Sequence, residues 1–228
     1  MAGNGDGIQA FRLDMDANGN PFVVHAALLW DEQEAILVDT GIPGQLDLIR
    51  KRLAEESIPL ERLTKIIITH QDRDHIGSLP ELLGVLGDRV QVLAHETAIP
   101  YITGEVPLIK SKALAPSLPV PVTPLQDGDV LPYAGGIRVI HTPGHTPDHI
   151  SLYHEPSKTL ITGDALTSGD GVLQSFDPKF TADASMAIQS VRKLLELDIE
   201  RVIAYHGGVC VDRIAERLRE IVDAGSEG

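Results

Sequence analysis

Short apolar segments followed within two residues by histidine or aspartate occur at four places in the chain, and this pattern constrains its fold most strongly. The four segments are Lys65–Thr69, Gly136–Ile140, Thr159–Thr162 and Arg201–Ala204. Short apolar runs bounded by turn residues are typical of buried strands. Because strands of one α/β core can end at a shared edge, we expect the side chains that follow them to meet there. The pattern therefore predicts a sheet core with one polar edge.

The densest of these sites directly follows the first segment and contains His70, Asp72, Asp74 and His75. Alternate residues of an extended loop point the same way, so the first three can converge, and His75 joins them as the chain turns into a helix. Buried imidazoles and carboxylates are costly without a cation, which favours a metal site. A solvated acidic turn with incidental histidines is the alternative for this segment taken alone.

The other three strand ends each offer one residue of a type that binds metal. They are His145, Asp164 and His206, and each stands next to a glycine. Glycine allows the backbone to approach closely at such turns. Together with the first cluster, these residues predict one constellation at one edge of the core.

Composition restricts the remaining classes of function. The 228 residues have a net charge of −14, which disfavours nucleic acid or an anionic membrane as a partner and favours a small-molecule substrate. The single cysteine, Cys210, excludes an internal disulfide and a cysteine-rich metal site. Met1–Gly7 shows no targeting features, and the longest apolar run, Phe22–Trp30, is too short to span a bilayer. We therefore expect a cytoplasmic protein.

The periodicity predicts alternating strands and helices. Helices are expected over Gln45–Glu56, from about Ile76 to Leu86, from about Ala184 to Leu195 with Thr181 or Asp183 as the N-cap, and over Val211–Val222; further strands are expected at Phe22–Trp30, Ala35–Asp39, Val90–Ala94 and Ile150–Tyr153.

A proline-rich stretch at about 99–125 interrupts this alternation. Since strands resume directly after it, we interpret it as a lid or insertion over a single domain, 1–228, rather than as a domain boundary. It is expected to shape substrate access or a subunit interface, the latter in a homodimer. The residues expected to line an apolar pocket are Tyr101, Ile102, Leu108, Ile109 and Leu114, with Lys110 or Lys112 meeting an anionic group.

The ordered set of motifs resembles the metallo-β-lactamase superfamily over most of the chain. The matching pieces are Leu37–Gly41, His70–His75, Thr142–Thr146, Gly163–Asp164 and His206–Gly207. The resemblance implies a four-layer αββα sandwich, in which two mixed sheets are flanked by helices. It also implies a dinuclear metal site at one end of the sandwich.

The resemblance also implies roles for the individual residues. His70 and His145 correspond to ligands of one metal, and Asp74, His75 and His206 to ligands of the second, while Asp164 corresponds to the carboxylate that bridges both. Asp39 resembles an aspartate that orients ligands without binding metal itself.

Asp72 departs from the commonest family motif, which has histidine at this position. Its carboxylate can still bind a hard cation, and it makes the site less positive and its metal a weaker Lewis acid. We expect two divalent ions, zinc foremost, with manganese or iron as alternatives at the site that contains Asp72. In the other interpretation Asp72 points away and the first site is partly empty.

The resemblance implies a hydrolase in which a metal-bridging hydroxide attacks a small ester, lactone or thioester, with Asp74 and Asp164 as catalytic residues. An iron-dependent oxidoreductase similar to persulfide dioxygenases is the alternative on the same fold. A non-catalytic, metal-stabilised binding module is a third.

The remaining histidines receive structural interpretations. His95 and His154 are expected at the surface, and His141 and His149 are expected to be structural, with contact to the ligand residues as the alternative. Cys210 is expected to be buried at the start of a helix.

Overall fold

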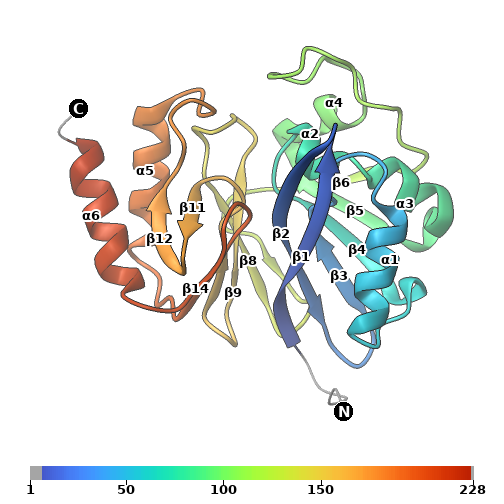
Figure 1. Cartoon of the computed structure of the whole chain (residues 1–228), viewed down its shortest axis with the longest axis horizontal. Helices are drawn as coiled ribbons and strands as arrows, with labels where there is room; N and C mark the ends of the chain where they lie inside the picture. The colour runs from blue at the N-terminus through green and yellow to red at the C-terminus, as the bar shows by residue number, and fades with distance from the viewer. Residues whose placement is uncertain (1–6, 227–228) are drawn as a thin grey trace. The chain divides into compact units, whose positions relative to one another are not determined.

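The computed structural model describes residues 7–226, so most of the N-terminal stretch interpreted as lacking a targeting signal lies outside the described residues. By its internal contacts the chain divides into two compact units, Met1–Leu125 (unit 1) and Gln126–Gly228 (unit 2). Each unit contains its own mixed sheet and its own helices (Figure 1).

Unit 1 is built on a six-stranded sheet. Its strands are β1 (Gly7–Ala17), β2 (Asn20–Trp30), β3 (Ala35–Val38), β4 (Leu63–Ile68), β5 (Gln91–His95) and β6 (Val122–Leu125). They lie in sequence order across the sheet; β1, β2 and β3 pair antiparallel, whereas β3 to β6 run parallel. Because parallel strands end at the same edge, the loops after β3 and β4 are neighbours.

The long strand β1 is absent from the sequence interpretation, although its pattern signals it. Phe11, Leu13 and Met15 alternate with exposed Arg12 and Asp14, and the three apolar side chains are buried. This is the period of two that marks a strand with one face on the core.

The helices of unit 1 are short. They are α1 (Leu46–Glu55), α2 (Arg73–Ile76), α3 (Leu79–Leu86) and α4 (Ile99–Ile102), with 3₁₀ turns at Leu60–Arg62, Gly87–Arg89 and Glu96–Ala98. The helix expected from about Ile76 begins instead at Leu79, after the single turn α2. The break falls at Gly77, where a Cβ atom would lie 2.4 Å from the backbone of Ile42 and Pro43.

The proline-rich stretch is regular only at its two ends. Its first residues form α4 and its last form β6, and the segment between them contains no helix or strand. This segment is the green loop that leaves α4 in Figure 1.

Unit 2 contains a second six-stranded sheet and a hairpin. The strands are β7 (Val130–Leu131), β8 (Ile137–His141), β9 (Ile150–His154), β10 (Thr159–Ile161), β11 (Leu166–Gly169), β12 (Val172–Ser175), β13 (Arg201–Ala204) and β14 (Gly208–Cys210). The order in the sheet is β14-β13-β10-β9-β8-β7, and β11 pairs with β12. Only β10 and β13 are parallel in this sheet, so both end at the same edge.

Two amphipathic helices, α5 (Ala184–Leu194) and α6 (Ile214–Ser226), pack beside each other in unit 2 (Figure 1). Of the two expected N-caps for α5, Asp183 is the one used: its Oδ1 accepts a hydrogen bond from the backbone N–H of Met186 at 2.9 Å. The expectation that a helix begins near Cys210 is wrong. Cys210 is buried, as expected, but it lies in β14, and α6 begins four residues later.

Within residues 7–226, no helix is long and apolar enough to cross a membrane.

Candidate functional site

In unit 1 the ends of β3 and β4 bring Asp39 and the loop that begins at Thr69 side by side. Val38 pairs with Ile67 in the parallel register, and the backbone N–H of Asp39 extends the ladder to the carbonyl of Ile67 at 2.9 Å. Asp39 and His70 therefore follow adjacent strands at the same edge. Both side chains are buried, with at most 1 % of their surface exposed.

The carboxylate of Asp39 fixes the orientation of His75. Its Oδ2 lies 2.9 Å from Nδ1 of His75, and since a carboxylate only accepts, this Nδ1 carries the proton. The Nε2 atom of His75 is then the basic nitrogen of the ring. Such a carboxylate–imidazole contact is the usual support of a metal-binding histidine.

Thr69 connects the same carboxylate to His70 and fixes the tautomer of its ring. Its hydroxyl donates to Oδ2 of Asp39 at 2.7 Å, so its oxygen can only accept at its other contacts, of which the shorter is with Nδ1 of His70 at 3.1 Å. The Nδ1 of His70 is therefore the protonated nitrogen, and its Nε2 is the basic one. One buried aspartate thus prepares two imidazoles for a cation.

Asp72 points toward His70 rather than away from it. Its Oδ2 lies 3.2 Å from Nε2 of His70, and only 8 % of its side chain is exposed. Asp74 stands on the first turn of α2, with its Oδ2 3.8 Å from Nε2 of His75 and 26 % of its side chain exposed. The rings of His70 and His75 have their centroids 3.9 Å apart. All four residues of the motif therefore gather in unit 1.

A residue of the proline-rich stretch also reaches this motif. The ammonium of Lys110 forms an ion pair with the same Oδ2 of Asp72 that faces His70. One residue earlier, the backbone N–H of Ile109 donates to Oε1 of Gln71 at 2.6 Å. The anionic group expected to meet Lys110 is thus a side chain of the motif itself.

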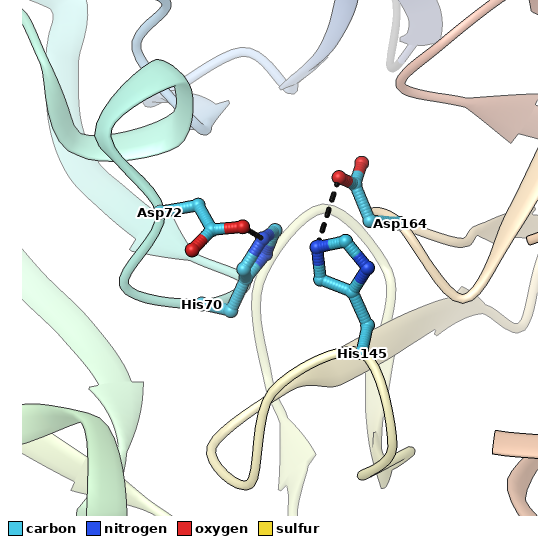
Figure 2. Close-up of side chains that lie close together, drawn as sticks. All are labelled: His70, Asp72, His145 and Asp164. Carbon is cyan, nitrogen blue, oxygen red and sulfur yellow. Dashed lines mark ion pairs between the residues drawn. The ribbon is translucent and has the colours of Figure 1, made fainter. Parts of the chain in front are cut away.

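In unit 2, Asp164 lies between two histidines. Its Oδ2 is 3.2 Å from Nε2 of His145 and 3.4 Å from Nε2 of His206. His145 and Asp164 are buried, whereas a third of the His206 side chain is exposed. A single carboxylate oxygen thus lies close to two imidazoles. Figure 2 shows the His145–Asp164 pair and, from unit 1, the His70–Asp72 pair.

The spacing in these pairs suits a shared cation. Charge-assisted N–H···O bonds are typically about 2.7–2.9 Å long, shorter than the 3.2–3.4 Å found between the Nε2 and Oδ2 atoms of these pairs. Ligand atoms at the corners of a tetrahedron around zinc lie about 3.3–3.4 Å apart, because Zn–N bonds are about 2.0–2.1 Å. The donor set therefore fits a divalent cation, whose ligands are neutral imidazoles and carboxylates.

Gly144 and Gly207, in the loops that carry His145 and His206, allow close packing, as expected from the sequence. Gly144 has φ +136°, and a Cβ atom on it would lie 2.4 Å from the backbone of Ala187 in α5. Gly207 has φ +108°, and its Cβ atom would lie 1.8 Å from the carbonyl oxygen of Ser168. Each glycine lets a neighbouring segment press against the loop that carries a histidine.

His149 has a closer connection to the site than its structural interpretation suggests. The backbone N–H of Asp164 donates to its Nε2 at 2.9 Å, so its Nδ1 carries the proton and donates to Oγ1 of Thr142 at 2.8 Å. That hydroxyl lies 3.1 Å from Oγ of Ser151, which donates to the carbonyl of Thr162 at 3.2 Å. This buried chain of hydrogen bonds holds the backbone at Asp164.

The expectation of surface positions for His95 and His154 is wrong. His95 ends β5 with 5 % of its surface exposed, and its Nδ1 contacts Oγ1 of Thr97 at 2.8 Å. His154 ends β9 with 6 % exposed and contacts the carbonyl of Ala134 and the hydroxyl of Ser157, both at 2.6 Å. Both residues pair with polar groups that sequence patterns do not show. His141 is half-buried, with its Nε2 on the carbonyl of Pro147 at 2.9 Å.

Comparisons with known proteins agree with this assembly of motifs. The model of the metallo-beta-lactamase superfamily matches residues 19–206. The chain is 30 % identical to the probable metallo-hydrolase YflN of Bacillus subtilis, over 75 % of each chain. It is 28 % identical to the hydroxyacylglutathione hydrolase GloC of Haemophilus influenzae, over 82 % of this chain and 86 % of that protein.

Solved structures show the same fold. A metallo-beta-lactamase family protein of Thermus thermophilus superposes with a TM-score of 0.70 at 23 % identity, over 97 % of this chain and 80 % of that chain. An archaeal superfamily protein of Sulfolobus tokodaii gives a TM-score of 0.69 at 21 % identity, over 96 % and 85 %. The expected fold class is confirmed: the chain belongs to the metallo-β-lactamase superfamily.

Proposed function

We propose that the chain is a dinuclear metal-dependent hydrolase that cleaves a small thioester, ester or lactone. The observation that carries the proposal is the position of Asp164, whose Oδ2 is shared by the Nε2 atoms of His145 and His206. The resemblance assigns these two histidines to different metals, and a carboxylate between them is suited to bridge both.

The proposal takes its two ligand sets from the family resemblance. His70, Asp72 and His145 would hold one ion, and Asp74, His75 and His206 the other. Support comes from the Nδ1 contacts of His70 and His75, which leave both Nε2 atoms basic. Further support comes from the family match, which covers residues 19–206 and therefore includes all seven proposed ligand residues.

Divalent ions bound there would supply Lewis acidity toward the substrate carbonyl and a water of lowered pKa. The chain's own part in the chemistry falls mainly to Asp74. It is the more exposed of the two carboxylates of the motif, with 26 % of its side chain exposed against 8 % for Asp72. Asp74 would accept the proton of the attacking water and return it to the leaving group.

A thioester is the preferred substrate class among the three. Two relatives, from Haemophilus influenzae and Francisella philomiragia, are named hydroxyacylglutathione hydrolases, and hydroxyacylglutathiones are thioesters. The net charge of −14 supports a small substrate rather than a nucleic acid. A cytoplasmic location and a homodimer remain predictions, which cell fractionation and light scattering would check.

The test combines metal analysis with a substrate panel. Protein from unsupplemented cells should contain two divalent ions per chain and should hydrolyse an acyl thioester, with activity lost on chelation and restored by the metal. Asp164→Asn should lose both ions and the activity, whereas Asp177→Asn, at an exposed aspartate outside the site, should retain them. One ion per chain would overturn the dinuclear assignment. Iron with dioxygen uptake and no hydrolysis would favour the oxidoreductase instead.

A further inference from the structure

A pocket of about 420 Å³ lies within unit 1, between the α2–α3 corner and the proline-rich stretch. Its size falls in the range of about 300–1,000 Å³ that is usual for sites of small ligands. The lining is mainly apolar and includes Ile76, Leu79, Ile102, Leu108, Leu114 and Ala115. Ile102, Leu108 and Leu114 are thus confirmed as pocket residues, whereas Tyr101 and Ile109 do not line it.

The outer wall of this pocket, residues 108–115, is held in place by hydrogen bonds and close packing. The N–H of Leu108 donates to the carbonyl of Ala113, and the N–H of Lys112 donates to the carbonyl of Leu108, both at 2.9 Å. Gly104 has φ +79°, and a Cβ atom on it would lie 2.3 Å from the carbonyl oxygen of Ala115. The wall is therefore joined by hydrogen bonds within its own backbone, and it packs tightly against the residues that follow α4.

Apolar surface remains exposed at the rim of the pocket. Leu114 has 60 % of its surface exposed, although a leucine at a packed position would be covered. A ligand with an apolar chain would remove this surface from water, and such burial is favourable by about 25 cal/mol per Å².

The polar groups at the pocket select the charge of its ligand. Arg73 lines it, and within residues 7–226 its guanidinium makes no hydrogen bond or ion pair. The other charged lining residue, Glu81, already accepts the backbone N–H of Gly44 at 2.8 Å. Ser111 accepts from the N–H of Ala113 at 3.4 Å, so its own proton remains to be donated. A cation and a hydroxyl donor are the partners that a carboxylate requires.

We propose that this pocket binds a medium-chain carboxylate, with the apolar chain inside and the carboxylate on Arg73 and Ser111. The site is separate from the metal motif. Arg73 and Ile76 lie one helical turn apart and face the pocket, whereas Asp72 and His75 point toward His70 and Asp39. The proposal therefore adds a second ligand site, and it does not depend on the proposed hydrolysis.

Calorimetric titration of the purified full chain with decanoate, below its micelle concentration, tests the proposal. We expect one saturable site per chain, with butyrate too short to bind and decanol at least about tenfold weaker, since decanol lacks the charge-assisted contact. Arg73→Gln should weaken decanoate binding to the level of decanol and leave decanol binding unchanged. Methyl resonances of Leu79 and Leu108 should shift during the titration.

Ala113→Trp should fill the pocket and abolish binding of both ligands. Ala113 is exposed, so the substitution leaves the core intact, and Ala54→Trp on the exposed face of α1 is the matched control that should bind normally. Decanoate binding that survives Ala113→Trp would mean that the carboxylate binds elsewhere, the metal ligands included, and would overturn the proposal. The proposal would also be overturned if the Arg73→Gln variant bound decanoate as tightly as the unmodified chain does, or if the unmodified chain showed no saturable binding. Because no turnover is measured, a failed hydrolysis assay leaves this result standing.

Discussion

Nδ1 of His75 donates a hydrogen bond to Oδ2 of Asp39 at 2.9 Å, in a buried contact between residues that follow adjacent parallel strands. Asp39→Asn places an amide where this carboxylate accepts three hydrogen bonds, so the imidazoles should lose their fixed tautomers. We expect metal affinity to fall by about 10–100-fold, measured by competition with a chelator. Asp14→Asn, at an exposed aspartate paired with Arg12, is the control. Unchanged affinity in Asp39→Asn would show that the contact does not prepare His75 for metal.

The ion pair between Lys110 and Asp72 leads to a second prediction. A metal at His70 and Asp72 would use the same Oδ2 that Lys110 holds, so the ammonium and the metal compete. Lys110→Met should therefore raise the affinity of the metal-free chain for its first ion, by about fivefold or more. Lys112→Met is the matched control, because Lys112 is exposed in the same turn. A fall in affinity would mean that Lys110 supports the metal ligands rather than opposing the metal.

The buried chain of hydrogen bonds through His149 predicts a loss of stability. His149→Phe leaves the N–H of Asp164 and the hydroxyl of Thr142 without their imidazole partner. We expect the free energy of unfolding to fall by about 1–3 kcal/mol, measured by urea denaturation of the metal-free chain. His141→Phe, in the same loop region but half-buried, should change it by no more than about 0.5 kcal/mol. Equal effects of the two substitutions would argue against the chain of hydrogen bonds.

Burial raises the pKa of the Cys210 thiol, although the side chain of Ser168 opposes the shift. The neutral thiol is therefore favoured in the folded state. Its contribution to stability is complete below the usual thiol pKa and is lost as the pH rises through the raised one. A disulfide reagent at pH 8 should not modify the native chain and should modify one thiol per chain in urea. In Cys210→Ala, the part of the alkaline loss of stability that comes from this thiol should disappear.

The candidate ligand residues could be located from sequence because each lies in the loop or turn that follows an apolar strand. Their binding of metal stays a prediction. Lys110 and His149 could not be assigned in the same way. Lys110 reaches Asp72 from a segment without periodicity, and His149 acts on a backbone N–H fifteen residues away in the chain. Such contacts depend on how loops pack, which periodicity does not encode.

Among the helices and strands, too, some follow from local sequence pattern and others depend on tertiary packing. The helix α1 appears where its periodicity predicts it, because one of its faces is buried. The central strands β3 and β4 appear where continuous apolar runs predict them, because most of their residues are buried. The break between α2 and α3 has another cause: Gly77 packs against the backbone at Pro43, a tertiary contact. Strand β1 is not among the predicted strands, although the sequence contains its signal, the alternation of apolar Phe11, Leu13 and Met15 with polar residues.

Asp39 has φ +64°, a left-handed conformation that costs most residues about 1–2 kcal/mol and glycine almost nothing. Glycine at this position would remove that cost, but it would leave the N–H and the hydroxyl of Thr69 and Nδ1 of His75 without their buried acceptor. Each such loss costs about 1–3 kcal/mol, which is more than the strain. A library randomised at position 39 should therefore return aspartate when it is sorted for metal retention, and sorting for thermal resistance of the metal-free chain should not enrich glycine. The backbone strain at the end of β3 is thus offset by hydrogen bonds of the same residue.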